Sequence, residues 1–340
     1  MPRALIAAVL STALLGCEAA STAGVETPPP PTAAPAAEAS PSPQTQAAAQ
    51  TSQTPQPFDS SKAWEHLRQM VLIGPRPAGS EPLRQTRAYI TRQLAAAGLT
   101  VEEQPFTVQT PIGTVNMINL VTRLPGRRTD KILITGHYDT KLIKTSVFVG
   151  ASDGASSAAM LIELARVLKG RPHEFTYEFV WFDGEEAFCP GWDECGRPGA
   201  PDNTYGSRYY VDALKKANAV STVKAMILLD MVGAKDLKLR KESQFGAAWL
   251  NDIFWTTAKK MGHGGTFLEG NGDVGGDDHE PFAKAGIATI DLIDLADYPQ
   301  WHNQECCDDL EHVSARSLQI VGDVMIAALP EVEKKLLTQK

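Results

Sequence analysis

The chain has 340 residues, of which 43% are hydrophobic, and this is enough for one large domain or two smaller ones with a real core. Its formal net charge of -8, without a run of Lys and Arg or a basic stripe between aromatic residues, argues against nucleic acid as a partner. We therefore expect a globular protein that has no nucleic-acid partner.

The first 17 residues have the pattern of a lipoprotein-type signal peptide. Arg3 precedes an apolar run of thirteen residues, ALIAAVLSTALLG, which is too short to span a membrane, and Cys17 follows it. The stretch LLGC resembles a bacterial lipobox, whose cysteine receives a lipid and becomes the mature N-terminus. We expect an exported bacterial lipoprotein, anchored through Cys17 on the periplasmic side of a membrane or at the cell surface. In the alternative, Cys17 is a chance residue of an ordinary secretory signal.

A linker is predicted over residues 18–57. The segment consists mainly of Pro, Ala, Ser, Thr and Gln, as in TPPPPTAAPAAEASPSPQTQAAAQ. Such a composition buries too little apolar surface to offset the conformational entropy of folding, and its prolines keep the chain extended. We therefore expect a disordered tether that holds a globular domain, residues 58–340, away from a membrane surface.

The predicted domain begins with two helices and a hairpin. The first helix follows FDSS, where Asp59, Ser60 or Ser61 can cap it, and the second covers about residues 82–97. Two stretches then alternate apolar and polar residues before the turn PGRRTD, which indicates a hairpin of QPFTVQT and VNMINLVTRL.

A regular series of apolar runs and amphipathic helices fills the rest of the domain. The predicted strands are KILITGHYD, FTYEFVWFDGEE, VKAMILLDMVGA and AGIATIDLID. The predicted helices are ASSAAMLIELARVLKG, YGSRYYVDALKKAN, AAWLNDIFWTTAKKMG and SARSLQIVGDVMIAAL. Strands this apolar are buried on both faces, and their alternation with helices favours parallel pairing. We expect an α/β fold, an α/β/α sandwich with a mostly parallel mixed central sheet, in one domain.

The cysteines after Cys17 can be oxidised in an exported protein. They are Cys189, Cys195, Cys306 and Cys307, and the sequence does not choose among their three full pairings. A disulfide between the adjacent Cys306 and Cys307 is disfavoured because the ring would be strained. A cysteine metal site is the weaker interpretation, since no C-x-x-C pair is present.

Polar residues follow the predicted strands of this series. In open α/β sheets the ligand site lies outside the carboxyl ends of the strands. The residues at these positions are His137, Asp139, Asp153, Glu185, Glu186, Asp230 and His302. A single His or Asp at a strand end is usually a cap, but a whole set in register predicts a metal site. Nitrogen and oxygen ligands without cysteine suit a catalytic zinc ion.

The motifs that carry these residues resemble the zinc aminopeptidase superfamily, over roughly residues 58–340. In chain order they are GHYDTK, GASDGASSAAMLIELAR, FVWFDGEEAF, LLDMVGA, DDHEPFAKAGI and WH. The superfamily includes dizinc exopeptidases and the zinc-dependent glutaminyl cyclases, and the resemblance implies one of these two activities.

The resemblance implies two arrangements of metal ligands. In the dizinc aminopeptidases, positions matching His137 and Asp230 hold one ion, positions matching Glu186 and His302 hold the other, and the position of Asp153 bridges them. In the glutaminyl cyclases a single zinc is held by the positions of Asp153, Glu186 and His302. Because all five side chains are present, the ligand types alone do not separate the two branches.

Other details resemble the cyclases more closely. HYDTK, FDGEEAF and YGSRYY are similar to the cyclase forms, and Asp277 and Trp301 stand where aminopeptidases commonly have Ser and Tyr. Two positions depart from the cyclase pattern: Asp291 replaces a usual histidine, and Gly136 leaves no counterpart of the animal cyclase disulfide. The resemblance thus implies a glutaminyl-peptide cyclotransferase with one zinc, which converts the N-terminal glutamine of peptides or proteins to pyroglutamate and releases ammonia.

The cyclase reaction needs a proton carrier and a pocket for the glutamine side chain. We expect Glu185 to carry the proton, within a hydrogen-bonded carboxyl cluster that includes Asp230 and Asp277. The expected pocket walls are Trp192, Tyr298 and Trp301, with ordinary core or surface aromatics as the alternative.

Several alternatives stay open. Lys141 can be a solvated lysine or a catalytic residue. His279 can be a structural histidine or a catalytic residue. A dizinc aminopeptidase would use Glu185 to activate a metal-bound water, and a lipid-tethered binding module would have lost turnover altogether. We expect a monomeric enzyme.

Overall fold

The computed structural model describes residues 56–272, 274–300 and 307–338. The predicted signal peptide and lipid anchor, and nearly all of the predicted linker, lie outside the described residues. Within the described part, no helix is long and apolar enough to cross a membrane.

The described residues form a six-stranded mixed sheet in the order β1-β2-β4-β3-β7-β10. The strands are β1 (Val101–Thr110), β2 (Gly113–Leu124), β3 (Arg128–His137), β4 (Phe175–Phe182), β7 (Val223–Asp230) and β10 (Ala288–Ile293). β1 and β2 form the predicted antiparallel hairpin, and β2 pairs antiparallel with β4. From β4 through β3 and β7 to β10 every pairing is parallel. The predicted α/β fold with a mixed central sheet is confirmed.

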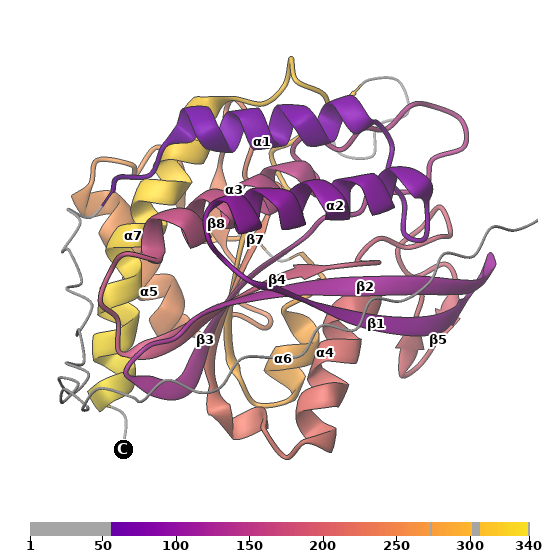
Figure 1. The fold of residues 1–340 in the computed structure, drawn as a ribbon. Helices are drawn as coiled ribbons and strands as arrows, with labels where there is room; N and C mark the ends of the chain where they lie inside the picture. The colour runs from indigo at the N-terminus through magenta and orange to yellow at the C-terminus, as the bar shows by residue number, and fades with distance from the viewer. Residues whose placement is uncertain (1–55, 273, 301–306, 339–340) are drawn as a thin grey trace, which may run out of the picture. The chain divides into compact units, whose positions relative to one another are not determined.

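Helices cover both faces of this sheet (Figure 1). On one face α1, α3 and α7 pack against one another, α2 packs on α1 and α3, and α5 packs on α7. On the other face α4 contacts β2 and β4, and α6 contacts β10. The helices are α1 (Ser60–Ile73), α2 (Glu81–Ala96), α3 (Ala155–Leu168), α4 (Tyr205–Lys216), α5 (Ala248–Lys260), α6 (Glu280–Lys284) and α7 (Ala315–Thr338).

The central strands are apolar along their whole length because both of their faces are buried. In β3, Ile132 and Ile134 join the hydrophobic cluster that includes α3, whereas Leu133 joins the cluster that includes α4. Each of these side chains has 0% exposure. The period of two along a strand therefore distributes apolar side chains to both layers, as expected for parallel strands between helices.

The predicted start of the first helix is confirmed, whereas the predicted end of the last helix is wrong. Asp59 caps α1, since its Oδ1 accepts the N–H of Ser61 at 3.0 Å. The last helix, predicted to end before Pro330, continues to Thr338. Glu333 in this extension accepts the N–H groups of both Glu174 and Phe175 through Oε1, and this tertiary contact stabilises the turns beyond the proline.

Short elements complete the fold at the edges of the domain. A two-stranded hairpin of β5 and β6 follows the loop after β4, and β8 pairs parallel with β9. These elements are β5 (Gly196–Arg197), β6 (Ala200–Pro201), the 3-10 helix η1 (Val220–Thr222), β8 (Leu239–Lys241) and β9 (Phe267–Asn271).

The start of α3 depends on Gly154. Its φ of 85° lies in the left-handed region that side chains rarely adopt. A Cβ atom there would meet the carbonyl oxygen of Asp139 at 2.4 Å and Cε1 of His137 at 3.1 Å. Glycine thus allows the N-terminus of α3 to approach the end of β3, and this approach brings Asp153 beside His137.

We predict that Gly154→Ala lowers the free energy of unfolding by about 3 kcal/mol or more, because a backbone oxygen cannot move aside cheaply. Gly262→Ala is the matched control: Gly262 has the same φ of 85°, but its Cβ would meet nothing within 4 Å. The control should lose only the free energy that a residue with a side chain costs at this positive φ, about 1–2 kcal/mol. Urea unfolding of both variants measures the difference, and equal losses would contradict the close approach.

Candidate metal and catalytic centre

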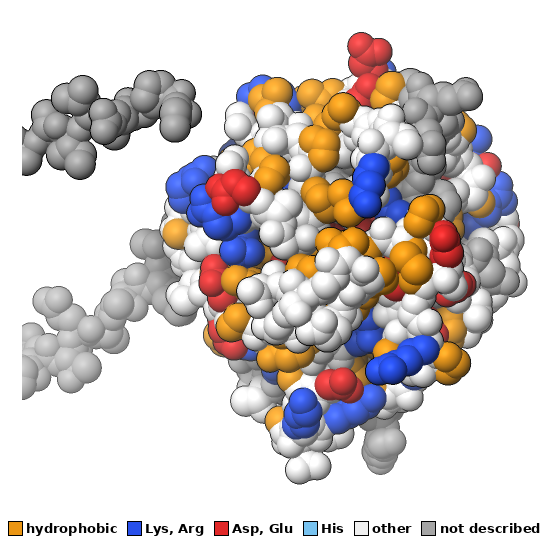
Figure 2. Space-filling view, turned by 90° about the vertical axis from the view of Figure 1, so that its right-hand side faces the viewer, with side chains coloured by type: hydrophobic (Ala, Val, Ile, Leu, Met, Phe, Trp, Pro, Cys, Tyr) orange, Lys and Arg blue, Asp and Glu red, His pale blue; other side chains and the backbone are white. Residues whose placement is uncertain are grey.

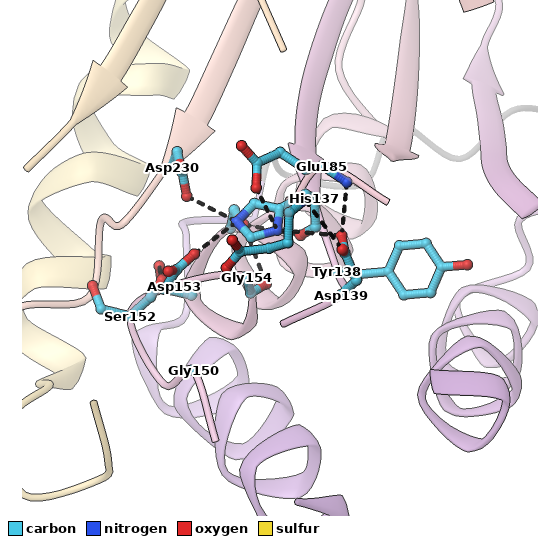
Figure 3. A network of polar contacts seen from close by, with 12 residues as sticks. His137, Tyr138, Asp139, Gly150, Ser152, Asp153, Gly154, Glu185 and Asp230 are labelled. Atoms are coloured by element: carbon cyan, nitrogen blue, oxygen red, sulfur yellow. Dashed lines mark hydrogen bonds and ion pairs between the residues drawn. The ribbon is translucent and has the colours of Figure 1, made fainter. Parts of the chain in front are cut away.

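The predicted polar residues meet at the carboxyl ends of the parallel strands. His137 ends β3, Asp230 ends β7, and Glu185 and Glu186 follow β4. Asp153 comes from the loop before α3. Figure 3 shows His137 at the centre, with Asp153, Glu185 and Asp230 around its ring. The prediction that these residues meet at one edge of the sheet is confirmed for them, while the predicted His302 lies outside the described residues.

His137, Asp153 and Asp230 form a group that can hold a metal ion. The Nε2 atom of His137 lies 3.1 Å from Oδ1 of Asp153 and 3.1 Å from Oδ1 of Asp230. One ligand atom from each residue lies within 4.8 Å of the others, and all three residues are buried. One nitrogen and two carboxylate oxygens in a buried site fit the donor preferences of zinc.

The electrostatics of this group favour a bound cation or shared protons. Burial raises the pKa of Asp230 to about 7, although His137 acts in the opposite direction. Burial also raises the pKa of Glu185 well above its usual value, and the charge of Glu186 adds to this shift. For His137, burial alone would lower the pKa, but Asp230 and Glu185 raise it well above the usual value of a histidine. Positive charge at this place therefore stabilises the carboxylates.

Asp139 positions the two glutamates through their backbone. Its side chain is fully buried, and its Oδ1 and Oδ2 accept the N–H groups of Glu185 and Glu186 at 3.2 and 3.3 Å. Asp139 was among the polar residues predicted at the strand ends, but no individual role was predicted for it. Its carboxylate fixes the turn after β4, so that Glu185 points toward His137, with 3.8 Å between Oε2 and Nδ1.

Asp308 fixes the loop that carries Asp153. Its Oδ1 accepts the N–H of Ser152 at 2.7 Å, and its Oδ2 accepts the N–H of Asp153 at 2.8 Å. The hydroxyl of Tyr298 donates to the same Oδ1 at 2.6 Å. Asp308 was not predicted from the sequence, because an acidic residue in a loop carries no signal of a distant backbone partner.

Arg76 stabilises the same loop from the other side. Its guanidinium is fully buried and donates to the carbonyl oxygens of Tyr138, Val149 and Gly150 at 3.0, 2.6 and 2.9 Å. Burial lowers the pKa of Arg76 to about 10, with Asp308 opposing the shift, so the side chain stays positively charged at neutral pH. The sequence analysis missed this buried cation too.

Asp277 belongs to a neighbouring buried cluster with Asp291 and His279. One ligand atom of each lies within 4.8 Å of the others. Burial raises the pKa of Asp291 well above its usual value, and the charge of Asp277 adds to the shift, so the protonated form of Asp291 is favoured. The charge of Asp277 also raises the pKa values of Glu185 and Asp230, which connects the two groups electrostatically.

Both ring nitrogens of His279 face carboxyl groups. Its Nε2 lies 3.2 Å from Oε2 of Glu242, and its Nδ1 lies 3.7 Å from Oδ2 of Asp291. Glu242 in turn accepts the N–H groups of Gln244, Phe245 and Gly246. These contacts favour the interpretation of His279 as a structural residue. Sequence reasoning did not identify Glu242.

A cavity of about 920 Å³ opens above the carboxylates. Its floor includes Asp153, Glu185, Glu186, Asp230 and Asp277. The described residues that line its outer part come from the loop after β4, from α4, and from the region before and within α6.

The predicted pocket aromatics have different positions. Trp192 lines the cavity. Tyr298 is 6% exposed and does not line it; instead its hydroxyl supports Asp308. Trp301 and His302 lie outside the described residues. Lys141 is only 4% exposed, so the alternative of a solvated lysine is wrong.

A disulfide joins Cys189 and Cys195 in the loop after β4. This finding selects one of the pairings that the sequence left open. A disulfide between Cys306 and Cys307 was disfavoured from the sequence. This prediction involves Cys306, which lies outside the described residues.

Comparisons with known proteins identify the family. The family model described as Peptidase family M28 matches residues 119–329. The chain belongs to Peptidase family M28. This result agrees with the predicted membership of the zinc aminopeptidase superfamily, and family M28 implies a metal, generally zinc.

Similar proteins include glutaminyl cyclases of bacterial and animal origin. The crystal structure of an Acidobacteriales bacterium glutaminyl cyclase is 31% identical, covers 86% of this chain and 100% of its own, and has a TM-score of 0.74. A glutaminyl-peptide cyclotransferase of Drosophila melanogaster is 30% identical over 71% of this chain and 73% of its own length. A structure described as a leucine aminopeptidase precursor from Bacteroides thetaiotaomicron is 26% identical, covers 81% and 98%, and has a TM-score of 0.73. The predicted resemblance to the glutaminyl cyclases is confirmed.

We predict that Asp308→Asn lowers zinc affinity by about 10- to 100-fold, because the loop that carries Asp153 loses a charged acceptor. Competition with a chromophoric chelator measures the dissociation constant. Asp309→Asn is the matched control, since the side chain of the neighbouring Asp309 accepts the N–H of Glu311 and bonds His312, whereas Ser152 and Asp153 donate their N–H groups to Asp308. Equal zinc affinity in both variants would show that Asp308 does not act on a metal site through Asp153.

Proposed function

We propose that the chain is a glutaminyl-peptide cyclotransferase that converts N-terminal glutamine of peptides or proteins to pyroglutamate. The observation that carries the proposal is the similarity to a glutaminyl cyclase over 86% of the chain at 31% identity. The geometry adds a buried glutamate that can hold a proton, placed beside a group of potential metal ligands.

The reaction forms a bond between the α-nitrogen and the side-chain Cδ of glutamine and breaks the bond between Cδ and the amide nitrogen. A proton must move from the attacking amine to the leaving nitrogen, which departs as ammonia. Glu185 is the group proposed to carry it. Its raised pKa allows the carboxylate to accept the amine proton and then to return it, as a general base and acid require.

Asp230 and Asp277 are proposed to support this proton transfer, since both line the cavity floor with Glu185. The pKa of each is raised by burial, and the charge of Asp277 raises the pKa of Asp230 further. A proton held by Asp291, whose pKa is raised well above its usual value by burial, would limit the repulsion that a fully ionised cluster would have. When Glu185 gains or loses a proton, Asp230 and Asp277 can adjust their own protonation, so the total charge of the cluster changes little.

One zinc ion is the proposed cofactor, held by Asp153, Glu186 and His302. When bound, it supplies a Lewis acid that polarises the side-chain carbonyl of glutamine. Asp308 and Asp139 hold the backbone of the first two ligands in place. A protonated His137 between Asp153 and Asp230 supplies the positive charge that a second ion supplies in a dizinc enzyme.

The side chain of the substrate needs apolar walls that hold it in a ring-closing shape. Trp192 lines the cavity and is the proposed wall on the side of the loop after β4. Trp301, next to the proposed ligand His302, is a second. For Tyr298 we propose an indirect role through Asp308.

A dizinc aminopeptidase is the second candidate. It is favoured by the geometry of His137, Asp153 and Asp230, which brings together the ligands of one ion of such a pair. The similarity to a leucine aminopeptidase precursor at 26% identity points the same way. A non-catalytic binding module is less well supported, because binding alone requires no buried glutamate that can exchange a proton.

For the cellular setting we propose an exported lipoprotein. Lipid attachment at Cys17 and the linker of residues 18–57 would place a monomeric catalytic domain on the periplasmic side of a membrane or at the cell surface. The signal pattern of residues 1–17 supports this proposal.

We predict that Glu185→Gln lowers kcat for a glutamine-initiated peptide by about 10²- to 10⁴-fold while zinc stays bound, since the amide cannot carry the proton. Ammonia release and zinc content are the measurements. Glu331→Gln, at an exposed position of α7, is the control. Full activity of the Glu185 variant would refute the role assigned to this residue.

We also predict one zinc ion per chain in the purified protein, because His137 provides the second positive charge. Elemental analysis by mass spectrometry gives the stoichiometry. Two zinc ions per chain, together with release of free amino acids from a peptide, would favour the aminopeptidase instead.

A further inference from the structure

The cavity is larger than the reacting glutamine requires. Its volume of about 920 Å³ lies near the upper end of the range of about 300–1,000 Å³ for pockets that enclose a whole small ligand. The reacting residue occupies only the floor, where Glu185 and the potential metal ligands lie. The outer part of the cavity therefore has room for the residues that follow the N-terminal glutamine.

The outer wall is built from a rim loop, which we define as residues 189–204. The disulfide between Cys189 and Cys195 closes its first part. The second part is tied to the first, since Asp202 Oδ2 accepts the N–H of Cys189 at 2.9 Å and Asn203 Nδ2 donates to the carbonyl oxygen of Trp192 at 3.1 Å. A wall fixed in this way loses little conformational entropy when a peptide binds.

The charges of the outer part differ from those of the floor. Five carboxyl groups line the floor, whereas the outer part carries four cationic and three acidic side chains. Two of the cations are paired: Lys284 with Glu280, and Lys215 with Asp212 at 3.8 Å. In Figure 2, separate Lys and Arg side chains lie among hydrophobic ones on the face toward the viewer.

The other two cations, Arg197 and Arg208, make no ion pair with any described residue. Arg208 is half-buried; its Nε and Nη2 donate to the carbonyl oxygen of Asn203 at 3.2 and 2.7 Å, and Nη2 also donates to that of Pro201 at 2.9 Å. These bonds orient the guanidinium and leave Nη1 without a hydrogen bond to the described residues. Arg197 is exposed in β5, on the same side of the cavity. Asp193, also exposed on the rim loop, is the remaining acidic side chain there.

We propose that the outer part of the cavity is a subsite for the second and third residues of the substrate, and that Arg208 and Arg197 select peptides with Asp or Glu at these positions. The inference rests on the proposed cyclotransferase function. A guanidinium presents its N–H donors in a planar fork that matches a carboxylate. The exposed Arg197 can present this fork, whereas Arg208, whose Nε and Nη2 are held by two carbonyl oxygens, is already oriented and offers Nη1 to the carboxylate.

The experiment compares glutamine-initiated hexapeptides that differ only at the second and third positions, with Glu, Ala or Lys there. We expect kcat/KM of the wild-type protein to be about three- to tenfold higher for Glu than for Lys, as for a partly exposed ion pair. Arg197→Glu should reduce or invert this ratio, and most of the change should appear in KM. Lys216→Glu is the control, since Lys216 is exposed on the same helix as Lys215 but does not line the cavity.

The possible results separate the two proposals. If no glutamine-initiated peptide releases ammonia, the proposed function fails and the subsite with it. If all peptides are cyclised with equal kcat/KM, or the Lys peptides are preferred, the enzyme is a cyclase and the subsite proposal is overturned. An equal change in Arg197→Glu and Lys216→Glu would also overturn it, because the effect would then come from net charge alone.

Discussion

The constraint on which this site depends is the burial of several carboxyl groups at one edge of the sheet. Asp153, Glu185, Glu186 and Asp230 are each at most 5% exposed. Burial without compensation would protonate them or destabilise the fold. Among the described residues, buried positive charge compensates them: Nε2 of His137 lies 3.1 Å from Oδ1 of Asp153 and of Asp230, and the charges of Asp153 and Glu186 act on the buried Arg76. His137 and Arg76 are far in the sequence from most of the carboxyl groups they compensate.

The fold makes this concentration of charge possible. Parallel strands place their carboxyl ends at the same edge, so one residue from each strand suffices to build the group. The approach of α3 to the end of β3, allowed by Gly154, adds Asp153 from a loop. The layer of α1, α3 and α7 buries one face of the sheet beside it, and this apolar packing supplies the stability that the polar edge lacks.

Much of the fold and of the inner site could be predicted because their signals are local. Continuous apolar runs identified the buried strands, and polar residues directly after them identified the edge of the sheet at which the carboxyl groups meet. The residues that position this edge could not be predicted. Arg76 and Asp308 act on loop atoms more than 70 residues away in the chain, and nothing in their local sequence indicates these partners. Tyr298 shows the same limit: an aromatic residue near the motif was expected at the pocket wall, but it supports Asp308 instead.

The disulfide of the rim loop links the shape of the cavity to the redox conditions around the protein. It spans only six positions of the chain, so it contributes little to the choice of fold, which the two hydrophobic clusters determine. Its effect is local, on the segment that carries Trp192. In reducing surroundings the carboxyl groups would assemble as they do here, but one wall of the substrate cavity would lack its covalent closure. The covalent closure of this wall therefore needs an oxidant, whereas the contacts that position the carboxyl groups involve no cysteine.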